Sequence, residues 1–347
     1  MNVRAAPERS GFRVAVVGAT GLVGETMIRV LEEREFPVSE LYALASARSV
    51  GRRVEFRGRS LPVRELADFD FGKADIGLFS PGAEVSRVYA PKAAAAGCVV
   101  IDNTSEFRYR EEIPLVVPEV NAHAISQYRN RGIIANPNCS TIQMVVALKP
   151  IHDAVGIEHI NVATYQSVSG AGREAVEELA AQSAALLSGK GPVEPNVIPK
   201  QIAFNCVPHI DAFQENGYTK EEMKMVWETR KILEDDAIQV NATAVRVPVF
   251  YGHSEAVHLT TRRKITAAEA RELLGRAPGV SVVDERCSGG YPTAAEAANR
   301  DTVYVGRIRE DMSSERGLNL WIVADNVRKG AATNSVQIAE ILAHEHL

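Results

Sequence analysis

The chain of 347 residues is 46% hydrophobic and 24% charged, which supplies apolar material for about two folded domains and excludes disorder as its main state. Its 39 basic and 44 acidic side chains leave a formal net charge of −5, and without a basic excess we expect no nucleic-acid partner. No apolar run approaches the ~20 residues of a membrane span, and residues 1–12 carry no apolar signal segment, so we expect no membrane partner and a cytoplasmic location.

The first part of the chain alternates short apolar strands with helical patterns. Residues 12–17 predict a strand that leads into the glycine-rich turn 18–24 and then a helix with an apolar stripe. Further elements are predicted as strands at 41–45, 74–79, 99–102 and 133–135, and as a helix over 83–96 closed by Gly97. This alternation is typical of a parallel, doubly wound α/β sheet, that is, a Rossmann-like domain.

The pattern changes at about residue 160, where helices between strands become fewer. Strands are predicted at 161–167, 240–249, 256–262, 303–308 and 318–324, with helices at 173–187 and 329–347 and an irregular connection at 188–208. We therefore expect a second, α+β domain with a mixed or antiparallel sheet.

The turn after the first strand has the spacing G-x-x-G-x-x-G, formed by Gly18, Gly21 and Gly24. Such a turn lets backbone N–H groups approach a pyrophosphate at a helix N-terminus, although a tight strand–helix connection explains the same letters. No acid follows the second strand, where an NAD enzyme usually places one for the ribose hydroxyl. Arg48 and the hydroxyl of Ser49 suit a 2′-phosphate instead, so we expect NADP, with a solvated loop arginine as the alternative.

Cys139 lies in a turn, residues 136–141, between a predicted strand and a helix expected to begin at Ile142. Unpaired N–H groups and the positive end of the dipole favour the thiolate at a helix N-terminus, whereas a buried cysteine beside a cap is the alternative. None of the four cysteines forms a C-x-x-C pair, and we expect no metal site.

A thiolate beside a nicotinamide cofactor predicts oxidation or reduction of an aldehyde through a thioacyl intermediate. His253 follows a predicted strand and is a candidate for the base, although a lone histidine is more often a hydrogen-bonded loop residue. Arg246 projects from that strand between apolar neighbours, and because an unpaired buried charge is costly it indicates a carboxylate ligand.

Nine motifs run in order along nearly the whole chain. They are VAVVGATGLVG, LASARSVG, DNTSEFR, PLVVPEVN, NPNCST, YQSVSGAG, EEMK, VRVPVFYGHSEAV and DNVRKGAA. Together they resemble the aspartate-semialdehyde dehydrogenase family, NADP-dependent enzymes of the route to lysine, threonine and methionine. The resemblance implies reversible reductive dephosphorylation of L-4-aspartyl phosphate to L-aspartate 4-semialdehyde through a thioacyl on the cysteine of NPNCST, with inorganic phosphate as the second product.

The resemblance also implies the site residues. The catalytic set is Cys139 as nucleophile, His253 as acid/base and Gln166, which positions the thioacyl group. The substrate set is Arg246 for the carboxylate, Glu221 for the amino group, and Arg108 and Lys224 for phosphate, assisted by Asn138. The cofactor set is Gly18, Thr20, Gly21, Leu22, Val23, Arg48, Ser49, Ser169, Gly170 and Asn326. Residues 219–222 fit a capping box, which places Glu221 and Lys224 on one helix face, where an exposed ion pair is the alternative.

In this family the last segment returns to the cofactor domain, so we expect an NADP-binding domain of residues 1–138 and 326–347 and a catalytic and dimerisation domain of residues 139–325, in a homodimer. Two alternatives stay open. N-acetyl-glutamyl-phosphate reductase shares the chemistry, but its motif is Asn-Pro-Gly-Cys where this chain has Asn138 before the cysteine. A non-catalytic NADP-binding homologue would usually have lost the nucleophile, which this chain keeps.

Overall fold

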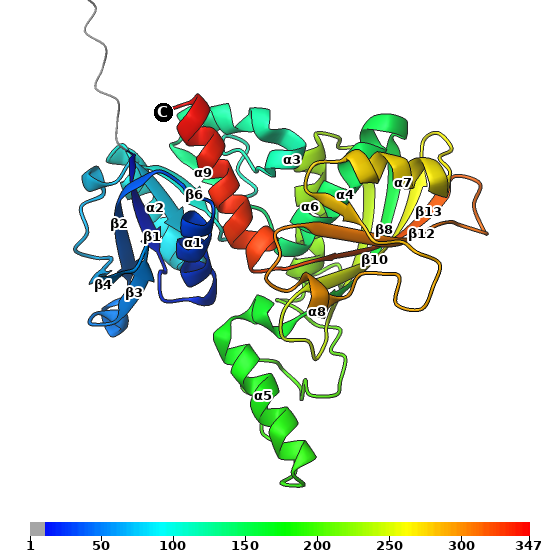
Figure 1. Ribbon diagram of the computed structural model, residues 1–347, viewed down its shortest axis with the longest axis horizontal. Helices are drawn as coiled ribbons and strands as arrows, with labels where there is room; N and C mark the ends of the chain where they lie inside the picture. Colours follow the sequence, from blue (N-terminus) through cyan, green and yellow to red (C-terminus); the bar gives the residue numbers. More distant parts are fainter. Residues whose placement is uncertain (1–10) are drawn as a thin grey trace, which may run out of the picture. The chain divides into compact units, whose positions relative to one another are not determined.

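The computed structural model describes residues 11–347, which divide into two compact units. Unit 1 comprises the residues up to Pro114, Ile125–Ala135 and Ser335–Leu347, and unit 2 comprises Leu115–Ala124 and Asn136–Asn334. Each unit is built around one sheet (Figure 1). None of the helices within residues 11–347 is both long and apolar enough to cross a membrane.

Unit 1 contains a seven-stranded sheet in the order β3-β4-β2-β1-β5-β6-β7. Its strands are β1 (Phe12–Val17), β2 (Val38–Ala45), β3 (Arg53–Phe56), β4 (Arg59–Glu65), β5 (Ile76–Phe79), β6 (Val99–Asp102) and β7 (Ile133–Ala135). All neighbours pair in parallel except β3 and β4, which form an antiparallel hairpin at one edge. The central strands are apolar and buried because helices cover a parallel sheet on both faces.

The helices of unit 1 are α1 (Leu22–Glu33), α2 (Ala83–Ala95) and most of α9 (Thr333–Glu345). Strand order reverses between β1 and β5, since the chain leaves β1 toward β2 and leaves β5 toward β6. Open α/β sheets bind ligands at the carboxyl ends of the strands where the order reverses, so the turn after β1 lies at the expected place for a nucleotide.

Unit 2 contains a six-stranded mixed sheet in the order β11-β12-β13-β10-β8-β9. Its strands are β8 (Ile157–Gln166), β9 (Gln239–Arg246), β10 (His253–Thr261), β11 (Val280–Val282), β12 (Val303–Glu310) and β13 (Gly317–Ala324). Strand β10 pairs antiparallel with both β13 and β8, while β8 and β9 run parallel. One face of β10 is buried along its length, and the first two side chains on that face are His253 and Glu255.

The helices of unit 2 are α3 (Pro118–Asn121), α4 (Cys139–Val155), α5 (Arg173–Leu187), α6 (Lys220–Leu233), α7 (Ala267–Arg276) and α8 (Ala294–Ala297). Helix α4 packs on β8, β10, β12 and β13, and α6 packs on both α4 and β9. Helix α5 extends away from the sheet (Figure 1) and buries its apolar side against the irregular segment that follows it.

The predicted fold class is confirmed in both halves: a mostly parallel sheet precedes a mixed one. The helix over 173–187 and the strand at 133–135 have the predicted bounds. The helix predicted to begin at Ile142 begins at Cys139 instead, because Asn138 caps it. The hairpin of β3 and β4 lies between predicted elements and was missed, since its short strands alternate in a charged segment.

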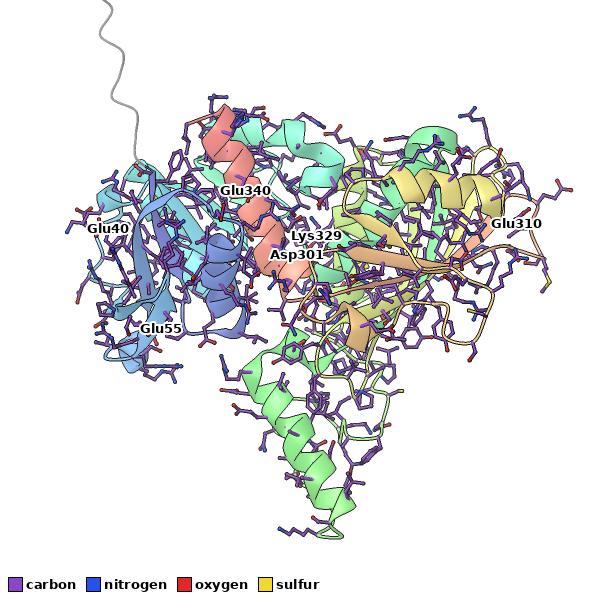
Figure 2. All side chains as sticks on the ribbon, viewed as in Figure 1. Glu40, Glu55, Asp301, Glu310, Lys329 and Glu340 are labelled. Carbon is purple, nitrogen blue, oxygen red and sulfur yellow. The ribbon has the colours of Figure 1, made fainter. Side chains whose placement is uncertain are left out.

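The last predicted helix, 329–347, is divided in the structure. Residues Arg328–Ala332 form a π-helical turn, and α9 follows from Thr333. Residues 115–124, 136–138 and 326–334, which the sequence placed in the cofactor domain, lie in unit 2. Within that unit, Lys329 donates to Glu119 at 2.6 Å and to Asn334 at 3.0 Å. Figure 2 labels Lys329 and Asp301 beside this turn, where Asp301 accepts from Thr333 at 2.6 Å.

Candidate active site

The glycine turn of unit 1 is shaped by close backbone contacts. Gly18 has a φ of +82°, and a Cβ there would lie 2.6 Å from the carbonyl oxygen of Ser80, which follows β5. Gly21 is the N-cap of α1 and forms no side-chain cap hydrogen bond. Since no side chain caps the helix, the first N–H groups of α1, at Leu22 and Val23, are available to an anion.

Hydroxyl groups from two segments meet beside this turn. Thr20 Oγ1 lies 3.2 Å from Ser49 Oγ, and Arg48 belongs to the same short 3-10 turn as Ser49, after β2. Arg48 is exposed, and residues 46–49 contain no acid. Two hydroxyls and a guanidinium are hydrogen-bond donors for a phosphate, so these residues could hold a phosphate group of a nucleotide.

In unit 2, Cys139 is the first residue of α4 and is half-buried. The side chain of the N-cap Asn138 accepts hydrogen bonds from the N–H groups of Ser140 at 3.0 Å and Thr141 at 3.3 Å. The backbone of the π-helical turn lies against the cysteine, since a Cβ on Gly330 would lie 2.8 Å from Cys139 Cβ. The cap fixes where α4 begins, and Gly330 limits how far Cys139 can move.

Glu221 connects most of the neighbouring polar side chains. Its Oε1 accepts from Asn138 Nδ2 at 2.9 Å and Gln166 Nε2 at 3.2 Å, and its Oε2 accepts from Lys224 Nζ at 2.9 Å. Lys224 also donates to Asp211 at 2.8 Å. Burial opposes ionisation of Glu221, but the Lys224 charge and these hydrogen bonds lower its pKa to about 2. The carboxylate therefore stays charged and holds Asn138 and Gln166 in place.

His253 is fully buried at the start of β10. The backbone N–H of Ser167 donates to His253 Nδ1 at 3.0 Å. A backbone N–H can only donate, so Nδ1 is an acceptor and the proton of the neutral ring is on Nε2. Burial and the charge of Arg246 lower the pKa of His253 to about 3, which keeps the ring neutral. His253 Nε2 has no hydrogen-bond partner among the side chains and backbone that the structure describes.

Arg246 ends β9 and is almost completely buried. Its Nη1 donates to the carbonyl oxygen of Ser167 at 2.8 Å. Burial lowers the pKa of Arg246, while the charges of Glu221 and Cys139 oppose this shift. The guanidinium thus lies near enough to Cys139 to favour a thiolate there and has donors left for a carboxylate.

The segment after β8 leaves space beside these groups. A Cβ on Gly170 would lie 2.8 Å from Arg246 Nη1 and 3.2 Å from His253 Nε2. Ser169 and Asn326 lie next to this segment: Asn326 Nδ2 donates to Ser169 Oγ at 3.0 Å, and Asn326 Oδ1 accepts from the N–H of Gly252 at 3.0 Å. A side chain in place of Gly170 would therefore crowd the Arg246 guanidinium and the His253 ring.

The structure therefore brings most of the predicted residues together within unit 2. These are Cys139, Gln166, Asn138, Glu221, Lys224, Arg246, His253, Ser169, Gly170 and Asn326. The remaining residues belong to unit 1, where Arg108 donates to the carbonyl oxygen of Asn103 at 2.9 Å.

Several polar residues of the site were not found from the sequence. Ser167 donates its N–H to His253, and Ser140 accepts from Gln166. Asp211 accepts from Lys224, and Glu228 accepts from the N–H of Asn138. Asp211 is 13 residues from Lys224, outside its helix, and Glu228 is 90 residues from Asn138, on the buried side of α6. No local spacing in the sequence therefore identifies either residue. Ser140 and Ser167 stand beside predicted site residues and could have been suspected from that position.

Comparison with known families and proteins agrees with this arrangement. The family model described as "Semialdehyde dehydrogenase, NAD binding domain" matches residues 13–128, and the model described as "Semialdehyde dehydrogenase, dimerisation domain" matches residues 148–329. The aspartate-semialdehyde dehydrogenase of Legionella pneumophila is 66% identical over 337 residues, which are 97% of each chain. That of Bacillus subtilis is 50% identical over 96% of this chain and 97% of its own.

Solved structures give the same result. Aspartate semialdehyde dehydrogenase II of Vibrio cholerae, complexed with ASA, superposes with a TM-score of 0.95 at 59% identity, covering 97% of this chain and 99% of that one. The enzyme of Candida albicans, solved with NADP, has a TM-score of 0.73 at 27% identity, over 96% and 99% of the two chains.

A nucleotide-binding sheet, a dimerisation domain and a cysteine at the capped start of a helix define the class as the semialdehyde dehydrogenases. Within this class, the chain belongs to the aspartate-semialdehyde dehydrogenase family.

Proposed function

We propose that the protein interconverts L-4-aspartyl phosphate and L-aspartate 4-semialdehyde with NADPH as reductant, through a thioacyl intermediate on Cys139. The observation that carries this proposal is the position of Cys139, which begins a capped helix within the electrostatic reach of Arg246 and beside the Glu221 network. The relatives named as aspartate-semialdehyde dehydrogenases along almost the full chain support the choice of substrate.

In the reductive direction, the thiolate of Cys139 attacks the carbonyl carbon of L-4-aspartyl phosphate. A C–S bond forms, the C–O bond to the phosphoryl group breaks, and inorganic phosphate leaves. NADPH, when bound, supplies the hydride that reduces the thioester carbon. The C–S bond then breaks, which releases the aldehyde and returns Cys139 as a thiolate.

The acid/base role of His253 takes a definite form in this tautomer. Its Nε2 carries a proton that can be shared with the substrate oxygen when that oxygen becomes negatively charged, and Nδ1 is occupied by the Ser167 N–H. Gln166, held by Glu221 and by Ser140 at 2.8 Å, positions the thioacyl group. We therefore assign His253 to the oxyanion and Gln166 to the orientation of the acyl chain.

Arg246 is assigned to the α-carboxylate of the substrate and Glu221 to its amino group. Arg108 and Lys224, assisted by Asn138, are assigned to the phosphate. The arginine has the burial and free donor geometry that suit a carboxylate, since a bidentate guanidinium pair is strongest where water is excluded. A free amino acid matches this charged pocket, whereas the acetylated amine of N-acetyl-glutamyl phosphate gives a carboxylate such as Glu221 no charge to pair with.

NADP is the proposed cofactor. The family match establishes an NAD(P)-binding domain, and the set of Thr20, Arg48 and Ser49 favours the 2′-phosphate. The Candida albicans relative, solved with NADP, supports the same choice. Gly18 and Gly21–Val23 would hold the pyrophosphate, and Ser169, Gly170 and Asn326 would contact the rest of the cofactor.

We also propose a homodimer, which the match to a dimerisation domain over residues 148–329 supports. The reaction would supply the semialdehyde from which lysine, threonine and methionine are made, as in the family. Light scattering at about 75 kDa, twice the mass of the 37.7 kDa chain, is the expected measurement for the dimer.

The test is reduction of NADP by purified protein given L-aspartate 4-semialdehyde, with and without phosphate, beside N-acetyl-glutamate semialdehyde. We expect phosphate-dependent turnover of the aspartyl substrate alone, with NAD a poorer acceptor. Cys139→Ser should still bind NADP and show no turnover. Turnover of the acetylated substrate would assign the pocket to the reductase family instead, and a silent wild-type protein that binds NADP would identify a non-catalytic homologue.

A further inference from the structure

A second row of buried polar side chains lies directly behind His253 and Gln166. Strand β10 pairs Glu255 with Thr164 of β8, one alternation further along the same sheet face from His253. Both residues are fully buried. Within residues 11–347, the two carboxyl oxygens of Glu255 have no hydrogen-bond partner, and neither has Thr164 Oγ1. Buried polar groups without partners are costly, so this row calls for an explanation.

Gln143 connects this row to the catalytic one. It lies one helical turn after Cys139 on α4, so the two side chains occupy the same helix face. Its Nε2 donates to the carbonyl oxygen of His253 at 3.4 Å, which joins the helix of the cysteine to the strand of the histidine. Its Oε1 has no partner among the described residues.

We propose that Glu255 is a positioning residue that acts through Gln143 to hold His253 relative to Cys139. As a carboxylic acid, Glu255 has an O–H group that Gln143 Oε1 can accept, and that bond orients the Gln143 amide toward the His253 carbonyl. An ionised Glu255 has no O–H to donate, so its carboxylate would repel Gln143 Oε1. The amide would then rotate away from the His253 carbonyl. This inference rests on the proposed function of His253.

The surroundings of Glu255 favour the neutral form. Burial raises the pKa of Glu255 well above the usual range. The nearby Gln143 side chain lowers this pKa, but by less than burial raises it. No charged side chain in the described structure contributes to that pKa. The charged groups that act on His253 itself are Arg246 and Glu221, in opposite directions, so Glu255 is separate from the charges of the site.

The decisive variant is Glu255→Met, which keeps the length of the side chain and removes its hydrogen-bonding atoms. Because an apolar side chain replaces a buried polar group without partners, we expect a melting temperature at or above that of the wild type. We expect kcat to fall about tenfold or more, with KM for the semialdehyde within about twofold. Glu255→Gln keeps a neutral hydrogen-bonding group and should retain kcat within about threefold.

Two controls separate positioning from loss of packing. Val257→Ala removes part of a buried side chain two residues along the same strand face, and it should lower the melting temperature with kcat unchanged. Gln143→Met should reproduce the loss in kcat, and the double variant with Glu255→Met should be no slower than either single variant, because both break one connection.

Wild-type kcat in Glu255→Met, or a Glu255→Gln enzyme as slow as Glu255→Met, would overturn the proposal while the proposed function stands. A wild-type protein without turnover would contradict the proposed function itself. In that case a crystal structure of Glu255→Met decides: we expect the bond between the Ser167 N–H and His253 Nδ1, 3.0 Å in the parent chain, to break, and an unchanged bond overturns the inference.

Discussion

The carboxylate of Glu221 and the ammonium group of Lys224 form an ion pair of 2.9 Å within α6, with side chains only 6% and 12% exposed. Pairs of this spacing on a helix are usually solvated and weak. Here Asn138 and Gln166 use the other carboxylate oxygen, so the pair forms the centre of the site network.

Replacing Glu221 by Gln should destabilise the protein by about 3–5 kcal/mol at pH 7, because Lys224 stays buried with Asp211 alone. Urea denaturation measures this change. Glu272→Gln, which breaks an exposed pair of Glu272 with Arg276 in α7, is the matched control and should change stability by less than about 0.5 kcal/mol. Equal effects of the two variants would contradict the buried network.

From the pKa of Glu221 we expect the free energy of unfolding of the wild type to decrease at acid pH. The pKa of Glu221 is lowered to about 2 in the folded protein, so the unfolded chain binds its proton first as the pH falls. The stabilisation is complete above about pH 4.5 and is lost between about pH 4.5 and 2. The difference in stability between the wild type and Glu221→Gln should shrink over that range, and a constant difference would count against it.

His253 predicts a second pH dependence at a higher range. Its pKa in the folded protein is lowered to about 3, so below about pH 6.5 the unfolded chain binds a proton that the native ring does not. The wild type should lose stability by about 1.4 kcal/mol per pH unit, relative to His253→Asn, as the pH falls from about 6 to 4. Glu255 titrates in both proteins and cancels in this comparison. A flat difference would mean that the folded histidine is charged.

We expect a side chain at position 330 to impair turnover by displacing Cys139. Since a Cβ on Gly330 would lie 2.8 Å from Cys139 Cβ, Gly330→Ala should displace the cysteine and lower kcat by about 100-fold. Gly275→Ala, in α7, meets nothing within 4 Å and should keep full activity with stability equal or higher by up to about 1 kcal/mol. Wild-type turnover in Gly330→Ala would show that the turn does not limit the position of the cysteine.

Arg48 predicts the choice of cofactor. Arg48→Ala should raise KM for NADP about tenfold and leave KM for NAD nearly unchanged, because only NADP carries the 2′-phosphate. Arg52→Ala is the control, since Arg52 lies in the same segment but forms an ion pair with Glu25, at 3.9 Å. If both variants changed KM for NADP alike, the effect would come from the general charge of the loop.

Local patterns in the sequence were sufficient for much of this protein. The glycine turn after β1, the alternation of strands and helices, and the capping box of Thr219 and Glu222 depend on neighbouring residues, so their spacing predicts them. Cys139 was placed near a helix N-terminus for the same reason, although the helix starts three residues earlier than predicted. Residue type and position alone indicated a carboxylate for Arg246, a base role for His253 and a phosphate for Arg48 with Ser49. The roles of Gln166, Glu221 and Lys224, and of Arg108 and Asn138, are implied by the family resemblance and not by spacing.

Only the tertiary structure decided which polar groups are buried and which partner each one has. The exposed-pair interpretation of Glu221 and Lys224 was as consistent with the local sequence as the buried pair, and nothing near His253 in the chain identifies Ser167 as its donor. Gln143 and Glu255 are 112 residues apart in the chain and share one buried row only because α4 packs on β10. Burial and long-range hydrogen bonds fix the protonation states of these groups, and both depend on how the strands and helices pack together, which the spacing of residues along the chain does not contain.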